Sequence, residues 1–274
     1  MSDIQQHKIA FIGCGNLARA MIEGLLGAGI EPGNIITTNR DARQLTEFIE
    51  RHAVCYEEHN SEAARVADVV FLSVKPAQLQ QVCKQISDDL NQGSIVISVA
   101  AGVELSLIRR WLSGHVNVVR AMPNLAASVA ESATTMYVDG IAQRCRDKVK
   151  QLLYLLGLVV VLPREEDLAI ATAIAGSGLA YFCLLEEAMV SVAERLGFDE
   201  KRATQLVKQV ALGAAQLVQP EEVCFEELRM SVTSPKGTTE AAIRSIQEQG
   251  FERMVGKGVE AAFLRSLELR SPKE

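Results

Sequence analysis

Histidine is scarce in this sequence, and cysteine is dispersed. Only four of the 274 residues are histidines, and none of them stands at metal-ligand spacing, so we expect no metal site. No Cys-x-x-Cys pair occurs, which argues against a zinc or disulfide framework. We expect the cysteines to be small core residues of a protein in a reducing cytoplasm. They stand at positions 14, 55, 83, 145, 183 and 224.

Basic residues are fewer than acidic ones, 28 against 34. The formal net charge is −6 and no basic run occurs, so we expect neither a nucleic-acid nor a membrane partner. No stretch approaches the roughly 20 apolar residues that cross a bilayer, and the N-terminus lacks the charged and apolar regions of a signal peptide. With 48% hydrophobic residues, the chain is predicted to be globular rather than disordered.

The first 163 residues alternate short apolar runs with helical segments. Runs such as 69–72 and 95–97 are continuously apolar, which is typical of strands covered on both faces. The alternation predicts a doubly wound, Rossmann-like parallel sheet, with room for an antiparallel edge. The predicted strands are 8–12, 34–38, 68–73, 94–99, 116–121, 133–138 and 158–162. We therefore assign residues 1–163 to an NAD(P)-binding domain.

Residues 164–274 have a helical pattern instead. The segment 199–218 carries an apolar stripe at helical spacing, which needs a partner. The segment 167–193 is apolar on more than one side, too much for a surface helix. Burial between two subunits would explain it, and the alternative is a central helix within a monomer. The expected fold class is thus α/β, with an all-α C-terminal dimerisation domain after the sheet domain.

A Gly-x-Gly-x-x-Ala turn follows the first predicted strand. Gly13 permits the tight turn, Gly15 lets the backbone approach a pyrophosphate, and Ala18 allows close packing of helix on strand. The amides and dipole of the following helix favour phosphate charge. Glycine-rich turns also occur where nothing binds, but here strand and helix flank the turn as a dinucleotide site requires. We predict that a dinucleotide cofactor binds here.

The end of the second predicted strand indicates which dinucleotide binds. NAD sites usually place an acidic residue there, whereas this strand ends in Asn39 and Arg40. A guanidinium suits the 2′-phosphate of NADPH, although Arg40 could also be an ordinary surface charge. If Asp41 is the N-cap of a helix beginning at 42–44, its carboxylate turns to backbone amides. We favour that cap, and hence NADPH, with NADH as a weaker substitute.

Five further motifs are not explained by the fold alone. They are Ser73-Val74-Lys75-Pro76, Ser98-Val99-Ala100-Ala101-Gly102, Arg120-Ala121-Met122-Pro123-Asn124, Ala175-Gly176-Ser177-Gly178-Leu179-Ala180-Tyr181 and Val232-Thr233-Ser234-Pro235-Lys236-Gly237-Thr238-Thr239. In this order and spacing the chain resembles the pyrroline-5-carboxylate reductase family, from about residue 8 to residue 265. The last motif is the most specific, while related β-hydroxyacid dehydrogenases share the architecture and the Val-Lys-Pro loop.

The resemblance implies reduction of Δ1-pyrroline-5-carboxylate, a cyclic imino acid, to L-proline, the last step of proline biosynthesis, by a homodimer with interlocked helical domains. The implied cofactor-binding residues are Gly13, Gly15, Asn16 and Leu17 at the pyrophosphate, Asn39 and Arg40 at the adenosine ribose, Asn60 near the adenine, and Val74, Lys75, Ala100 and Ala101 toward the nicotinamide. The implied substrate-binding residues are Glu166, Ser231, Ser234, Gly237, Thr238 and Thr239. We expect the Thr239 hydroxyl to contact the ring nitrogen, as the catalytic residue.

Plainer interpretations exist for several of these positions. Pro76 could simply begin a helix, and Lys75 could face solvent. Pro123-Asn124 could be a turn, and Glu166 could be an early-helix carboxylate favoured by the dipole.

Two positions depart from the family pattern. Leu179 stands where the family usually has proline, and Lys236 stands where it usually has glycine. If position 236 needs a positive φ, lysine costs on the order of 1 kcal/mol or more there. Two rival functions remain. One is a β-hydroxyacid or ketoacid oxidoreductase of the same architecture that uses a lysine for acid–base chemistry. The other, which the two departures support, is a non-catalytic NADPH-binding protein.

Overall fold

The structure is a computed structural model that describes residues 3–41, 43, 45–115, 117–220 and 222–269. The chain divides into two compact units. One comprises Met1–Gly176 together with Ala262–Glu274, and the other comprises Ser177–Ala261. Within the described residues, every strand belongs to the first unit.

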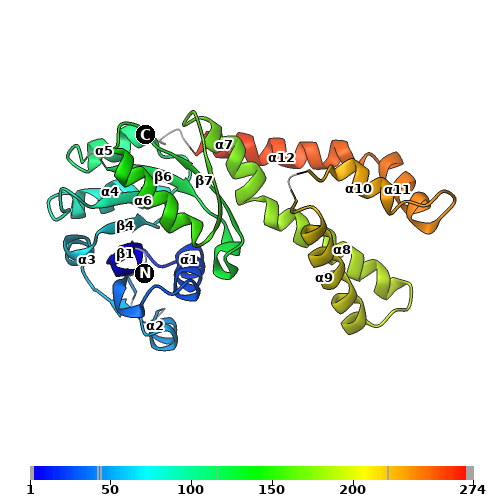
Figure 1. Ribbon diagram of the computed structural model, residues 1–274, viewed down its shortest axis with the longest axis horizontal. Helices are drawn as coiled ribbons and strands as arrows, with labels where there is room; N and C mark the ends of the chain where they lie inside the picture. Colours follow the sequence, from blue (N-terminus) through cyan, green and yellow to red (C-terminus); the bar gives the residue numbers. More distant parts are fainter. Residues whose placement is uncertain (1–2, 42, 44, 116, 221, 270–274) are drawn as a thin grey trace. The chain divides into compact units, whose positions relative to one another are not determined.

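One eight-stranded sheet forms the centre of the first unit (Figure 1). Its strands are β1 (Ile9–Ile12), β2 (Ile35–Thr38), β3 (Cys55–Tyr56), β4 (Val69–Leu72), β5 (Ile95–Ser98), β6 (Val118–Met122), β7 (Ser132–Tyr137) and β8 (Gly157–Val161). Their order is β3-β2-β1-β4-β5-β6-β7-β8. β1 pairs in parallel with both β2 and β4, so the winding reverses beside β1. β6 and β7 are antiparallel whereas β7 and β8 are parallel, so the antiparallel edge contains two strands.

All the predicted strands are present, within one or two residues of the expected bounds. Position 116, where the fifth was expected to begin, lies outside the described residues. The prediction missed β3 because a strand of two residues is too short to show a periodic pattern.

The sheet is buried on both faces. Ile9 and Phe11 point into one core, while Ala10 and Ile12 point into the other, as the alternation of side chains along a strand requires. The first core is covered by α1 (Asn16–Gly27), α2 (Thr46–His52) and α6 (Gln143–Tyr154), and the second by α3 (Asn60–Val66), α4 (Pro76–Ile86) and α5 (Leu105–Trp111). The short 3-10 helices of the described residues in this unit are η1 (Asp3–Gln6), η2 (Pro32–Asn34) and η4 (Leu125–Val129). The doubly wound architecture is therefore confirmed.

Helices alone follow β8 in the described part of the chain. They are α7 (Asp167–Ala171), the π-helical turn η5 (Thr172–Gly176), α8 (Gly178–Arg195), α9 (Glu200–Leu217), α10 (Phe225–Ser231), α11 (Thr238–Glu248) and α12 (Phe251–Glu268). The predicted helix at 199–218 is α9, and its N-cap is Asp199, whose carboxylate accepts a hydrogen bond from the Arg202 amide at 3.0 Å.

The helical segment Asp167–Arg195 corrects one expectation. By length and composition it could cross a membrane, with a mean hydropathy of 1.9 over an 18-residue window of which 28% is buried. The expectation that no stretch approaches this composition was wrong. Residues 168–185 carry no charge, but their alanines, glycines and hydroxyl residues make the run less conspicuous than one of leucine and valine. Core helices of soluble proteins also pass this test, so it is weak support for a membrane span.

All six cysteines are free, and they fall into two groups. Cys14, Cys83 and Cys145 are buried core residues, as expected. The expectation was wrong for Cys55, Cys183 and Cys224, which are exposed. Burial raises the pKa of the Cys14 thiol to about 11 and that of Cys83 to about 12.

Candidate active site

The turn between β1 and α1 has the geometry that the glycine pattern predicts. Gly13 has a φ of +87°, and a Cβ there would come within 2.7 Å of Cγ1 of Val74. Gly15 caps α1 without a side chain, and a Cβ on it would meet nothing within 4 Å. The first amides of α1 thus have no side-chain cap and are available to a ligand. A phosphate group fits this cradle.

An open cavity of about 750 Å³ lies over this turn, at the carboxyl edge of β1, β2 and β4. Its size is within the roughly 300–1,000 Å³ of small-molecule and cofactor sites. Of the residues predicted to hold the cofactor, those that line the cavity are Gly13, Gly15, Asn16, Asn39, Arg40, Asn60, Val74 and Lys75. The winding reverses at this edge, which is where open α/β sheets bind their ligands.

A chain of hydrogen bonds links the elements around the cavity. The Gly13 amide donates to Oγ1 of Thr38 at 3.3 Å, and that hydroxyl donates to Oδ1 of Asn60 at 2.7 Å. Nδ2 of Asn60 donates to Oε1 of Gln85 at 3.0 Å. Asn60, predicted to lie near the adenine, therefore also joins β2, α3 and α4. Thr38 was not predicted as a site residue, although a hydroxyl at the end of the second strand was a usable signal.

The charge around the cavity is mainly positive. Arg19, Arg40 and Lys75 line it, and Glu58 is the one carboxylate among its described lining residues. The guanidinium of Arg19 lies 5.5 Å from the ring centroid of Phe48, a cation–π contact. Arg19 was not predicted, although its position one helical turn after Gly15 places it on the ligand side of α1. This balance favours a polyanionic ligand.

Glutamines on one face of α4 also line the cavity. Gln78, Gln81 and Gln85 stand three and four residues apart, which places them on the same side of the helix. They too were not predicted, because polar residues on a helix indicate a site only when the helix is known to face one. α4 begins at Pro76, as the plainer interpretation of that residue expects.

The Asp41 carboxylate, which could bind the ribose hydroxyl in an NAD site, is hydrogen-bonded to Arg43 instead. Its Oδ1 accepts hydrogen bonds from the backbone amide and Nε of Arg43, both at 3.2 Å. The carboxylate thus faces a backbone amide, as a cap would. Positions 42 and 44 of the helix predicted here lie outside the described residues, and α2 begins at Thr46.

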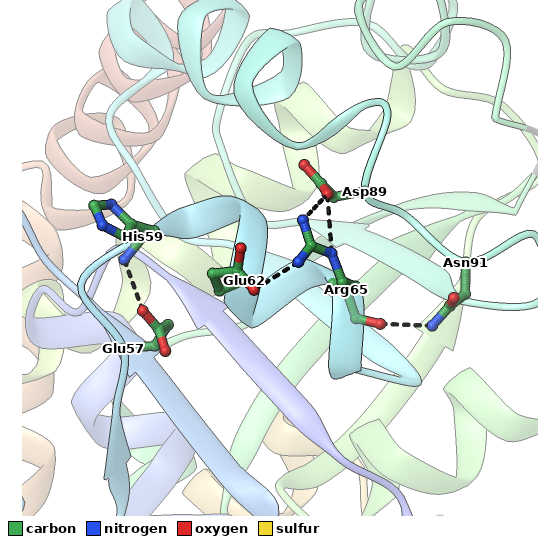
Figure 2. A network of polar contacts seen from close by, with 6 residues as sticks. All are labelled: Glu57, His59, Glu62, Arg65, Asp89 and Asn91. Atoms are coloured by element: carbon green, nitrogen blue, oxygen red, sulfur yellow. Dashed lines mark hydrogen bonds and ion pairs between the residues drawn. The ribbon is translucent and has the colours of Figure 1, made fainter.

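Polar contacts fix α3 beside the cavity (Figure 2). Arg65 donates to Oδ1 of Asp89 through Nη2 at 2.6 Å and through Nε at 3.1 Å, and its Nη1 donates to Glu62 at 2.8 Å. Nδ2 of Asn91 donates to the Arg65 carbonyl at 2.8 Å. These bonds attach α3 to the segment that follows α4. The two helices that carry Asn60 and the glutamines are therefore held together.

The predicted cofactor residues Leu17, Ala100 and Ala101 lie outside the lining of this cavity, and so does the predicted substrate residue Glu166. Leu17 packs against the first core, and Ala100 and Ala101 follow β5 at the same edge of the sheet as Val74. Glu166 stands before α7, and its Oε1 lies 3.6 Å from Nη1 of Arg164. The structure therefore does not bring Glu166 to the cofactor cavity.

The neighbouring Glu165 forms contacts that were not predicted from the sequence. Its Oε1 accepts from Nη1 of the buried Arg120 at 2.8 Å and from the Leu105 amide at 2.6 Å. Arg120 belongs to β6 and Leu105 begins α5, so this carboxylate joins both to the start of α7. An arginine inside an otherwise apolar strand is a signal for such a buried partner.

Four of the predicted substrate residues lie at or just before the start of α11: Ser234, Gly237, Thr238 and Thr239. Ser231 ends α10, and its Oγ donates to the Leu228 carbonyl at 2.8 Å. Gly237 is the N-cap of α11, and its amide donates to the Ser234 carbonyl at 3.0 Å. Thr238 and Thr239 form the first turn of the helix. Helix amides in a first turn lack intrahelical partners, so this end can bind a carboxylate.

Lys236 adopts the conformation that glycine usually occupies. Its φ is +61°, so the predicted cost of a non-glycine residue, on the order of 1 kcal/mol, applies. The Lys236 amide donates to Oε2 of Glu240 at 2.7 Å. Glu240 stands three residues after the cap Gly237, where a glutamate that reaches back over the helix start is typical.

Comparisons with known proteins agree with this geometry. Residues 165–269 match the family described as pyrroline-5-carboxylate reductase dimerisation, and residues 8–102 match the family described as NADP oxidoreductase coenzyme F420-dependent. A pyrroline-5-carboxylate reductase of Pseudomonas aeruginosa is 40% identical over 264 residues, which cover 96% of each chain. The chain belongs to the pyrroline-5-carboxylate reductase family. A member from Vibrio alginolyticus is 34% identical over 97% of this chain and 98% of its own.

Solved structures of this family have the same fold. The pyrroline-5-carboxylate reductase of Coxiella burnetii is 36% identical, with a TM-score of 0.86, over 97% of this chain and 99% of its own. The Plasmodium falciparum pyrroline carboxylate reductase, solved with NADP bound, is 25% identical with the same TM-score and coverage. The family predicted from the motifs and the fold class predicted from the apolar patterns are both confirmed.

Proposed function

We propose that this chain reduces Δ1-pyrroline-5-carboxylate to L-proline with a hydride from NADPH, the last step of proline biosynthesis. The observation that carries the proposal is the 40% identity to a pyrroline-5-carboxylate reductase across 96% of both chains. The cavity over the glycine turn, with its open amides and positive charge, is consistent with it. When bound, the cofactor supplies the hydride.

The two parts of the chain have separate tasks in this proposal. Residues 1–163 hold the cofactor, and residues 164–274 bind the substrate and dimerise. Ala100 and Ala101, which follow β5 at the cofactor edge of the sheet, lie toward the nicotinamide, and Glu166, which is outside the cavity lining, serves the substrate. Arg40 binds the 2′-phosphate, because a guanidinium recognises phosphate through two hydrogen bonds, so NADPH binds more tightly than NADH.

The substrate carboxylate binds at the start of α11. The amides of Lys236 and Gly237 already donate to Glu240 and Ser234, so the amides of Thr238 and Thr239 serve the carboxylate. The Thr239 hydroxyl contacts the ring nitrogen and steadies its protonation. A ring imine protonated on nitrogen accepts a hydride readily, so the protein mainly orients the reacting atoms.

The working enzyme is a homodimer in the cytoplasm. A match to a dimerisation family over residues 165–269 supports the dimer, and six free cysteines are typical of a reducing compartment. The exposed apolar side chains of α8 then contact the second subunit.

Oxidation of NADPH by the purified protein, followed by its absorbance, tests the proposed reaction. We expect oxidation that depends on pyrroline-5-carboxylate and forms L-proline. Turnover with a β-ketoacid but none with the imine would favour the rival oxidoreductase. Tight NADPH binding without turnover of either compound would favour a non-catalytic protein.

A further inference from the structure

The Arg40 guanidinium is held by a neutral side chain. In the amide orientation that satisfies both residues, Oε1 of Gln78 accepts from Nη2 of Arg40 at 2.8 Å and from Nη1 at 3.3 Å. The opposite orientation would set the Gln78 amide NH₂ against the guanidinium, donor against donor. Both side chains line the cofactor cavity, one from the end of β2 and one from the first turns of α4.

The acid nearest to Arg40 in sequence is engaged elsewhere. Asp41 accepts from Arg43, and no ion pair involving Arg40 occurs among the residues that the structure describes. An amide oxygen orients a guanidinium but does not cancel its charge, whereas a carboxylate would do both. The positive charge of Arg40 therefore stays available to an anion in the cavity.

We propose that Gln78 is a positioning residue that sets the cofactor preference. It aims Arg40 into the cavity and leaves its charge uncompensated, so that the pair selects a dinucleotide with a 2′-phosphate. This inference rests on the proposed cofactor role of the cavity. It does not depend on which imine is reduced.

The decisive variant is Gln78→Glu, which keeps the size of the side chain and adds a carboxylate against Arg40. We expect the Kd of NADPH to rise at least about tenfold, because the carboxylate neutralises Arg40 and repels the phosphate. The Kd of NADH should change less than about twofold, since NADH carries no phosphate there. Nucleotide fluorescence titrations of the full chain measure both constants without substrate. Equal weakening of both cofactors would overturn the proposal.

The matched control is Gln80→Glu, which adds the same charge to the exposed side of α4, outside the cavity lining. It should leave both Kd values within about twofold, since an exposed charge is strongly screened by solvent. Gln78→Ala removes the contact without adding charge. It should raise the Kd of NADPH by a smaller factor than Gln78→Glu does and leave the Kd of NADH unchanged.

A double-mutant cycle tests whether Gln78 acts through Arg40. In the Arg40→Ala background, which lacks the guanidinium, Gln78→Glu should raise the Kd of NADPH much less than it does in the wild-type background. Additive losses would mean that Gln78 acts independently, and the proposal would fail. Titration with adenosine 2′,5′-bisphosphate and with AMP repeats the comparison without the nicotinamide. Because none of these measurements needs pyrroline-5-carboxylate, failure here and failure of the proposed reaction are distinguishable.

Discussion

The two units of this chain bury their apolar side chains to very different degrees. In the first unit, all residues of β1, β4 and β5 are buried, and cores lie on both faces of the sheet. In the second unit, Phe182 on α8 is 69% exposed and Phe225 on α10 is 76% exposed. A single chain thus completes one core and leaves the other open. Exposed apolar surface of this kind marks an interaction site.

The difference in burial separates the predicted cofactor site from the predicted substrate site. The cofactor cavity is lined wholly by residues of the first unit, so one chain forms it. The start of α11, with its predicted substrate residues, belongs to the second unit, whose helices leave large apolar side chains exposed. We therefore expect cofactor binding to survive changes that abolish dimerisation, and turnover not to survive them.

The largest effect is expected from Phe182→Glu on α8. A charge in an apolar subunit interface costs several kcal/mol, so we expect loss of the homodimer and at least about a hundredfold loss of turnover. NADPH binding should remain, because the cavity lies in the first unit. Light scattering gives the mass, and Gln205→Glu on the exposed side of α9 serves as the control. A monomeric variant with full activity would contradict the comparison.

Thr239→Ala should have the next largest effect. Loss of the hydroxyl at the ring nitrogen should lower kcat/KM by about ten- to a hundredfold and leave the Kd of NADPH unchanged. Thr239→Ser keeps the hydroxyl and should retain most of the activity. Steady-state kinetics with each variant measure this, and an unchanged kcat/KM for Thr239→Ala would remove the residue from the mechanism.

Arg40→Ala tests whether the first unit selects NADPH through its 2′-phosphate. Without the guanidinium, the Kd of NADPH should rise about tenfold or more, while that of NADH should rise less than about twofold. Arg51→Ala is the control, because Arg51 is exposed on α2 and lies outside the cavity lining. Equal loss for both cofactors in a binding titration would mean that Arg40 does not bind the 2′-phosphate.

The smallest effect concerns the buried thiols of the first unit. With a pKa of about 11, Cys14 holds about one thousandth of its thiol as thiolate at pH 8, and Cys83, with about 12, holds still less. The exposed Cys55 should therefore be alkylated well before either of them, and labelling of Cys14 should accelerate as the pH rises toward 11. Mass spectrometry of labelled peptides at pH 8 and pH 10 measures the order. Rapid labelling of Cys14 at pH 8 would show that the core opens readily.

The sequence predicted the first unit well because its signals are local. Continuous apolar runs identify buried strands, and the glycine turn identifies the phosphate cradle, with Gly13 at the positive φ that the pattern requires. Gln78 escaped prediction because the rotation of a helix decides which side chains reach the cavity. That rotation follows from packing against the sheet, which a single helix sequence does not encode.

The second unit was predictable in outline only. Helix bounds such as those of α9 follow from caps and periodicity. For Lys236 the sequence raised a positive φ as an open condition, and the structure has it. The apolar character of α8 was predicted, but what covers it was not, because its apolar residues are exposed in the single chain. For the same reason the length and composition of Asp167–Arg195 resemble those of a membrane span.

A crystal structure of the protein soaked with NADPH and L-proline tests the central claim most directly. We predict the cofactor pyrophosphate against Gly15, the 2′-phosphate at Arg40, and the proline carboxylate on the amides of Thr238 and Thr239. Proline bound away from residues 231–239, with the cofactor in place, would contradict the account.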